Sequence, residues 1–157
     1  MENATEISIS DLTAQQIQLL DAAIGVRRYA YVPYSGYKVG AALLTVEGKI
    51  FDGINVENAA YPLSMCAERT VVFKANSEGY RDYSDIAIAT SNAGISCGGC
   101  RQVLSEFAQL AGHDITMIFT SVEKDHILMS SIYRLLPSAF GPIDIEEDVF
   151  PYLNGPK

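Results

Sequence analysis

Residues 66–100 read CAERTVVFKANSEGYRDYSDIAIATSNAGISCGGC, a stretch in which helical and strand patterns follow one another. Helical periodicity runs over 67–76, and Gly79 is the expected stop. The apolar run 85–90 predicts a buried strand, and the pattern of 99–111 predicts a further helix that ends at a glycine. This alternation is typical of an α/β fold.

On the N-terminal side of this stretch, the sequence predicts one helix and one hairpin. Thr13 begins a capping box, which opens a helix expected over 13–31. The apolar runs 39–46 and 50–56 flank a tight reversal in which Gly48 suits a positive φ. The chain therefore enters the α/β region through an antiparallel pair of strands.

On the C-terminal side, residues 115–120 are expected to form a strand and 130–135 a short last helix. A hairpin followed by helix–strand alternation predicts a mixed sheet with helices on both faces, which is a three-layer α/β/α arrangement. Only the first ten residues and the tail 150–157 have the composition expected of disordered ends.

Length, composition and charge exclude several classes of protein. The chain has 157 residues, 48% of them hydrophobic, which predicts a single domain over 1–157 that needs no disulfides. Its net charge of −8 disfavours polynucleotides and anionic lipid surfaces as partners. No apolar run approaches the roughly 20 residues of a membrane-spanning helix. The acidic start 1–6 differs from a signal peptide, so we expect a cytoplasmic location.

The three cysteines all lie where a predicted helix begins, at Cys66, Cys97 and Cys100. A helix N-terminus favours the thiolate, which is the form that binds metals. Cys97 and Cys100 share one face of a first turn, and a helix followed by a strand of similar length returns the chain from Cys66 to Cys97. Three ligands leave the fourth tetrahedral position of Zn²⁺ open, which is typical of a catalytic site.

A carboxylate and two basic side chains accompany these cysteines. Glu68 would face the pocket if Cys66 occupies the helix cap, and it could then move protons. Arg69 and Arg101 could offset the negative charge of the thiolates. A metal, a neighbouring carboxylate and a cavity that excludes water suit the hydrolytic displacement of an amine from an amidine-like carbon.

Two plainer interpretations of the cysteines compete with this one. Cys97 and Cys100 alone could be a redox pair at the start of a helix. A structural zinc would need a fourth ligand, for which His113 and His126 are the candidates. We expect both histidines to be solvated loop residues.

Five blocks occur in order along the chain: 39–42 (VGAA), 55–59 (NVENA), 66–70 (CAERT), 97–102 (CGGCRQ) and 135–142 (LLPSAFGP). Together they resemble the small three-cysteine, zinc-dependent cytidine deaminases. The resemblance covers about 13–142 and implies a mixed five-stranded sheet, a core over those residues, and a homotetramer with shared active sites.

The resemblance implies a particular chemistry. Zn²⁺ would be bound by Cys66, Cys97 and Cys100, with Arg69 donating hydrogen bonds to the thiolates. Glu68 would move protons to ring N3 and to the departing ammonia while hydroxide attacks C4. The reaction would be the hydrolytic deamination of cytidine and deoxycytidine to uridine and deoxyuridine.

The resemblance also implies substrate contacts. Ribose hydroxyls would bind Asn55 and Glu57, and the base carbonyl would meet the N–H of Ala67. The three aromatic residues concerned are Tyr37, against the nucleoside, and Tyr61 and Phe140, in a neighbouring subunit's pocket. Taken without the resemblance, Asn55 and Glu57 could equally form a turn, and the aromatic residues could belong to a core or an interface.

Three positions depart from the family pattern. Ser96 stands where the family normally has Pro, Tyr37 replaces a more usual Phe, and Ser138 replaces another Phe. Ser96 concerns the rigidity of the loop before Cys97, whereas Tyr37 and Ser138 leave the substrate range open. The alternatives are a blasticidin-type or modified-nucleoside deaminase on the same fold, and a non-catalytic protein stabilised by zinc.

Overall fold

The computed structural model describes residues 3–145 and 151. Its strands are β1 (Thr5–Ile7), β2 (Gly40–Thr45), β3 (Ile50–Ile54), β4 (Tyr83–Ala89), β5 (Thr116–Thr120) and β6 (Ile127–Ser131). Its α-helices are α1 (Ala14–Val26), α2 (Ala67–Ser77), α3 (Gly98–Ala111) and α4 (Ile132–Leu135). Within these described residues, no helix is both long enough and apolar enough to cross a membrane.

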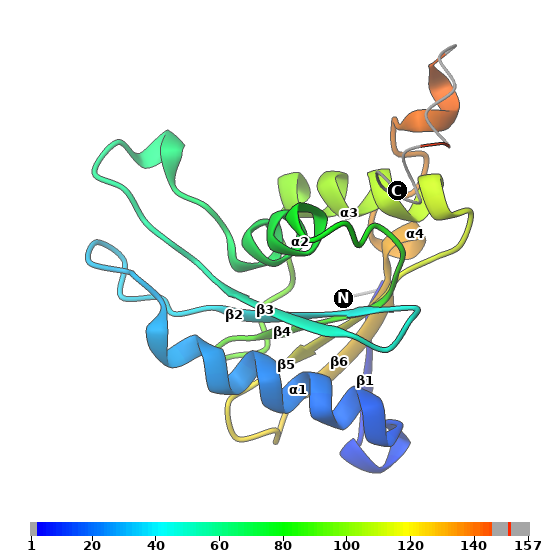
Figure 1. The fold of residues 1–157 in the computed structure, drawn as a ribbon. Helices are drawn as coiled ribbons and strands as arrows, with labels where there is room; N and C mark the ends of the chain where they lie inside the picture. The colour runs from blue at the N-terminus through cyan, green and yellow to red at the C-terminus, as the bar shows by residue number, and fades with distance from the viewer. Residues whose placement is uncertain (1–2, 146–150, 152–157) are drawn as a thin grey trace.

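The strands form one sheet, in the order β1-β6-β5-β4-β2-β3. β4 and β5 are parallel, and the other neighbouring strands are antiparallel. Helix α1 covers one face, whereas α2, α3 and α4 lie over the other (Figure 1). The prediction of a mixed sheet between two helical layers is therefore confirmed.

Each face of the sheet buries its own hydrophobic core. Because successive strand residues point to opposite faces, Leu43 packs in the core under α2 and α3, whereas Leu44 packs in the core against α1. All six residues of β2 are buried, as expected of a strand covered on both sides.

The expectation of five strands is wrong, because the described residues form six. Neither β1 nor β6 is among the strand ranges expected from the sequence, and β1 lies within the first ten residues, where we expected disorder. It pairs with β6, with Thr5 opposite Met129 and Ile7 opposite Ile127. The short helix α4 starts at Ile132, because β6 occupies the residues before it. The expectation for the tail 150–157 lies outside the described residues, except at Pro151.

Local signals set the element ends much as predicted. The Thr13 side chain accepts a hydrogen bond from the backbone of Gln16, and the capping box is complete. Gly48, Gly79 and Gly112 all have positive φ, at the hairpin turn and after α2 and α3. The first helix is shorter than expected, because its last turn tightens into a 3-10 helix over Arg27–Tyr29.

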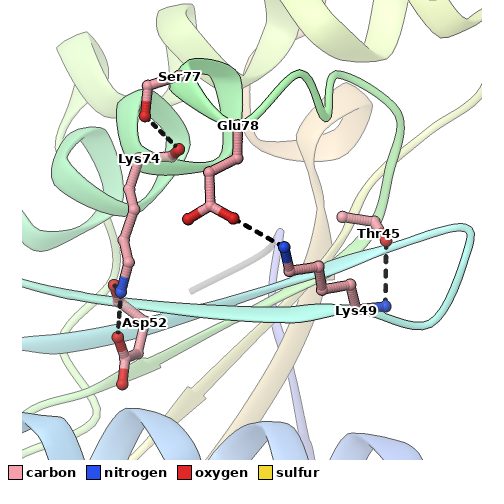
Figure 2. Close-up of polar contacts among 6 residues, drawn as sticks. All are labelled: Thr45, Lys49, Asp52, Lys74, Ser77 and Glu78. Atoms are coloured by element: carbon pink, nitrogen blue, oxygen red, sulfur yellow. Dashed lines mark hydrogen bonds and ion pairs between the residues drawn. The ribbon is translucent and has the colours of Figure 1, made fainter.

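Helix α2 is held on the β2–β3 hairpin at close range. A Cβ atom on Gly53 would lie 2.7 Å from the backbone nitrogen of Val71, so only glycine allows this approach. On the outer side, Lys74 Nζ lies 2.7 Å from Asp52 Oδ1, and Lys49 Nζ lies 2.7 Å from Glu78 Oε2 (Figure 2). The position of α2 matters because its first residues belong to the site described next.

Candidate active site

The three cysteine sulfur atoms form one cluster. Cys66 is the N-cap of α2, Cys97 is the N-cap of α3, and Cys100 lies in the first turn of α3. The Sγ atoms of Cys66 and Cys97 are 4.0 Å apart, and those of Cys97 and Cys100 are 3.4 Å apart. All three lie within 4.8 Å of one another. The predicted return of the chain from Cys66 to Cys97 is confirmed.

This cluster fits a tetrahedral metal ion. Two sulfur atoms bound to one Zn²⁺ at about 2.3 Å each stand about 3.8 Å apart, close to the spacings found here. His113 and His126 lie elsewhere: His113 Nε2 is 2.7 Å from Asp82 Oδ1, and His126 Nδ1 is 2.8 Å from Glu6 Oε1. Neither histidine belongs to the cluster, so the structural-zinc interpretation lacks its candidate fourth ligands.

The charges of the thiols depend on one another. Hydrogen bonding with Cys100, together with Arg69, lowers the pKa of Cys66 to about 5. The same contact with Cys66 raises the pKa of Cys100. A bound cation would favour the thiolate form of both cysteines, because a thiol that coordinates a metal loses its proton.

Arg69 contacts the cluster as the resemblance implies. Its Nη2 donates to the sulfur of Cys66 at 3.7 Å. Its Nε is buried and finds no hydrogen-bond partner among the described residues. A guanidinium held here offsets part of the negative charge of the thiolates.

Glu68 occupies the position that the sequence predicted for a proton carrier. Cys66 is the helix cap, with extended backbone angles, so Glu68 lies in the first turn of α2. The side chain lines the cavity beside Cys66, yet only 5% of the residue is exposed. Burial raises the pKa of this carboxyl above its ordinary value. A carboxyl of raised pKa is well suited to hold and release a proton near neutral pH.

A cavity of about 410 Å³ opens above the cluster, a size typical of small-molecule sites. The wall of the cavity is formed by segments 35–39, 55–57, 64–68 and 88–97. Its lining residues are Ser35, Tyr37, Val39, Asn55, Glu57, Ser64, Met65, Cys66, Glu68, Ile88, Thr90, Gly94, Ile95, Ser96 and Cys97.

Asn55 and Glu57 both shape this cavity and line it. Asn55 accepts a hydrogen bond from the Val39 backbone at 2.8 Å and donates one to the Tyr37 carbonyl at 2.8 Å. The hydroxyl of Ser35 donates to Glu57, as do two backbone N–H groups, and together they lower the pKa of this carboxyl. No turn lies at these positions, because Val56 between them forms β-bridges with Tyr31 and Met65. Both side chains hold the loop 34–39 in place, and their ribose role stays a prediction.

Of the other residues predicted to contact the substrate, some lie at the cavity and some lie away from it. Tyr37 lies in the cavity wall. Ala67 is buried at the first position of α2, where a backbone N–H has no partner within the helix. Tyr61 is 69% exposed and lines a neighbouring hollow with Tyr34, whereas Phe140 is 67% exposed and lies outside the lining of this cavity. The structure therefore does not bring Phe140 to the site of its own chain.

Sequence reasoning missed several lining residues. Thr90 follows β4 at the carboxyl end of a sheet strand, which is a general signal for a ligand site. Ser35 lies in a loop after Pro33, and Ile95 lies in the loop before Cys97. No local pattern distinguishes Ser35 or Ile95 from ordinary loop residues.

Several known proteins are similar to this chain in sequence. The family model of the cytidine and deoxycytidylate deaminase zinc-binding region matches residues 13–111. The cytidine deaminase of Sporosarcina psychrophila is 42% identical over 121 residues, 76% of this chain and 86% of that protein. The cytidine deaminase of Halalkalibacterium halodurans is 44% identical over 131 residues, 82% of this chain and 96% of that protein.

A solved structure is similar in fold as well. The crystal structure of cytidine deaminase from Burkholderia pseudomallei matches with a TM-score of 0.74 and 41% identity, and the match covers 82% of this chain and all of that one (100%). The matched residues 13–111 include all three cysteines and Glu68. The similarity therefore extends to the elements that build the sulfur cluster.

Proposed function

The chain belongs to the cytidine deaminase family, and on that premise we propose that it hydrolyses cytidine and deoxycytidine to uridine and deoxyuridine, with release of ammonia. One observation carries the proposal: three sulfur atoms within 4.8 Å of one another lie beside a buried carboxylate in a cavity of nucleoside size. Residues 13–142 form the core of a single domain with this activity.

Zinc is the proposed metal, held by Cys66, Cys97 and Cys100. Three thiolates are soft ligands that suit Zn²⁺, and the family model describes a zinc-binding region. Zinc bound there supplies a Lewis acid that lowers the pKa of water, so that hydroxide is available near neutral pH. Arg69 stabilises the ligand set by donating to Cys66.

Glu68 carries the proton. Its carboxylate takes a proton from the attacking water, as oxygen adds to C4 of the base. It passes this proton to ring N3, then takes the proton of the new C4 hydroxyl and delivers it to the amino nitrogen. The C4–N bond breaks as the C4 carbonyl forms, and the amine leaves as ammonia. The balance is cytidine plus water to uridine plus ammonia. The raised pKa of Glu68 suits a group that must be protonated and deprotonated in each cycle.

Asn55, Glu57, Ala67 and Tyr37 bind the nucleoside. Asn55 and Glu57 bind ribose hydroxyls, the backbone N–H of Ala67 meets the base carbonyl, and the Tyr37 ring lies against the nucleoside. Among the described residues that line the cavity, none is Lys or Arg, and Glu57 adds a negative charge. We therefore expect nucleosides to be preferred over nucleoside phosphates.

The assembly and location follow from the same premise. A homotetramer would cover the exposed rings of Tyr61 and Phe140, which enter a neighbour's pocket. The three cysteines are free thiols, which suits a reducing compartment such as the cytoplasm.

The proposal is tested with the purified, zinc-loaded protein and cytidine. We expect the absorbance of the cytosine band to fall as ammonia appears in equal amount, and deoxycytidine to react as well. If cytidine and deoxycytidine are inert but an aminopyrimidine antibiotic or a modified nucleoside reacts, the alternative deaminase replaces this proposal. If zinc is retained and no amine substrate reacts, the chain is a binding protein.

A further inference from the structure

One side-chain hydrogen bond joins two segments that line the cavity and are distant in sequence. The hydroxyl of Tyr37 donates to Oδ1 of Asn92 at 2.8 Å. Tyr37 belongs to the lining segment 35–39. Asn92 belongs to residues 90–97, which we call the ligand loop because they connect β4 to Cys97. The contact spans 55 residues of sequence and reaches the loop that holds a proposed metal ligand.

The bond is the outer end of a short network inside the ligand loop. The hydroxyl of Thr90 donates to the same Oδ1 of Asn92 at 3.3 Å. The backbone N–H of Gly94 donates to the Thr90 hydroxyl oxygen at 2.8 Å. Thr90 is only 2% exposed, so the inner part of the network is shielded from water. Tyr37 therefore connects segment 35–39 to the buried part of the loop.

The backbone of the ligand loop needs support. Ala93 has a φ of +52°, a left-handed conformation that is uncommon for a residue with a Cβ atom. Such a conformation persists only where surrounding contacts hold it. The side chain of Ser96 adds no tether, because its Oγ is buried without a hydrogen-bond partner in the described structure. Near Cys97, the loop is held by Arg101 Nε, which donates to the Ser96 carbonyl at 2.9 Å.

The fit between Tyr37 and the loop is also steric. A Cβ atom on Gly94 would lie 2.8 Å from the Tyr37 hydroxyl oxygen, so the end of the ring rests on the loop backbone. Both the hydrogen bond and this close approach depend on a tyrosine at position 37.

We infer that Tyr37, through Asn92, is a positioning residue that holds the ligand loop in the geometry needed for deamination. This inference rests on the proposed function. The aromatic ring lies against the nucleoside in the proposed function, and the hydroxyl holds the ligand loop through Asn92. These two roles can be separated, because phenylalanine keeps the ring and loses only the hydroxyl.

The first test compares Tyr37→Phe, Asn92→Ala and the double variant in cytidine deamination. A lost hydrogen bond of this kind corresponds to a fall of about threefold to tenfold, which we expect for both single variants, mainly in kcat because the ring is retained. The double variant should be no worse than Asn92→Ala alone, because that variant already removes the bond from Tyr37 together with the bond from Thr90. Tyr29→Phe removes a hydroxyl from an exposed ring outside the cavity lining and is the matched control.

The second test does not depend on activity. Backbone amide hydrogen exchange over 90–97, measured in the zinc-loaded protein, should be faster in Tyr37→Phe and in Asn92→Ala than in the wild type or in Tyr29→Phe. Unchanged exchange, or losses of activity that multiply in the double variant, would overturn the inference. If the wild type fails to deaminate cytidine, the proposed function fails, and the exchange measurement still decides whether the bond holds the loop.

Discussion

The two ends of helix α2 carry similar charged groups in opposite surroundings. At its start, Glu68 lies buried beside Cys66 and Arg69. At its end, Glu78 is paired with Lys49, and the two side chains remain 46% and 43% exposed (Figure 2). A glutamate thus lies at each end of one helix, with one shielded from water and the other hydrated.

The difference between the ends is one of solvation. Burial raises the pKa of Glu68, because a charged carboxylate is costly away from water. At the other end, the hydrogen bond with Glu78 raises the pKa of Lys49, so this ammonium stays charged in an exposed ion pair that adds little stability. A helix therefore provides a reactive carboxylate only where the fold removes solvent from it.

The largest expected effect comes from replacing the buried glutamate at the start of α2 with glutamine. Glu68→Gln should lower kcat for cytidine by about 10²- to 10⁴-fold, the range typical of a lost proton carrier, while the protein keeps its zinc. Activity is measured by loss of the cytosine absorbance, and zinc by elemental analysis.

Glu78→Gln is the matched control, because it removes the same charge from the same helix. We expect its kcat and zinc content to equal those of the wild type, with only a small shift of the urea midpoint. The comparison between the two ends breaks down if Glu68→Gln turns over cytidine at a near-normal rate, or if both substitutions reduce activity alike.

A second effect concerns the metal. Loss of a residue that hydrogen-bonds to a metal ligand typically lowers metal affinity by about 10- to 100-fold. We expect a loss of zinc affinity of about this size for Arg69→Gln, and a larger loss for Cys97→Ser, which removes a proposed ligand. Competition with a chromophoric chelator at neutral pH measures both. Acidification should release zinc from the wild type, because the ligands must be deprotonated. Zinc binding that is unchanged by Cys97→Ser would refute the proposed ligand set.

The smallest effect lies at the partly exposed pair of His113, which follows α3, and Asp82, which lies between α2 and β4. Hydrogen bonding to the Asp114 carbonyl, together with Asp82, raises the pKa of His113. A raised pKa means that the stabilisation is complete below the unfolded-state pKa of about 6.5 and disappears as the pH rises through the folded-state value. His113→Gln should therefore lower the free energy of unfolding at pH 5.5, by less than about 1 kcal/mol after screening by solvent, and leave it unchanged at pH 8.5.

Urea unfolding of wild type and variant at each pH measures this difference. A loss of stability that is larger at pH 8.5 than at pH 5.5 would have the wrong sign and would contradict the assignment.

Elements with local signals could be predicted well from the sequence. The glycines after α2 and α3 and the capping box of α1 are short-range features, and they marked these ends closely. Strand β1 could not be predicted, because Thr5–Ile7 is largely exposed and has no strong pattern of its own. It exists because β6, about 120 residues away, offers an edge to pair with.

In the candidate site, too, features with local sequence signals could be predicted, and features that depend on distant residues could not. The cysteine cluster and Glu68 could be predicted, because helix and strand lengths return the chain to its starting point and because helix starts have known chemistry. The contact between Tyr37 and Asn92 depends on the shapes of two loops that are distant in sequence, so no spacing rule could identify it. For Phe140, the resemblance implied a role that involves a second subunit, and the fold of one chain leaves this residue away from its own cavity.

The sulfur atoms come from two helices that meet only once β4 is inserted between its neighbours. During synthesis, a growing chain therefore has no complete metal-binding cluster until its sheet is built. The proposed zinc would bind the finished fold, and its binding would add to stability with the logarithm of its free concentration. Cells short of zinc would then contain the folded protein in a form that unfolds more readily on heating and is degraded sooner.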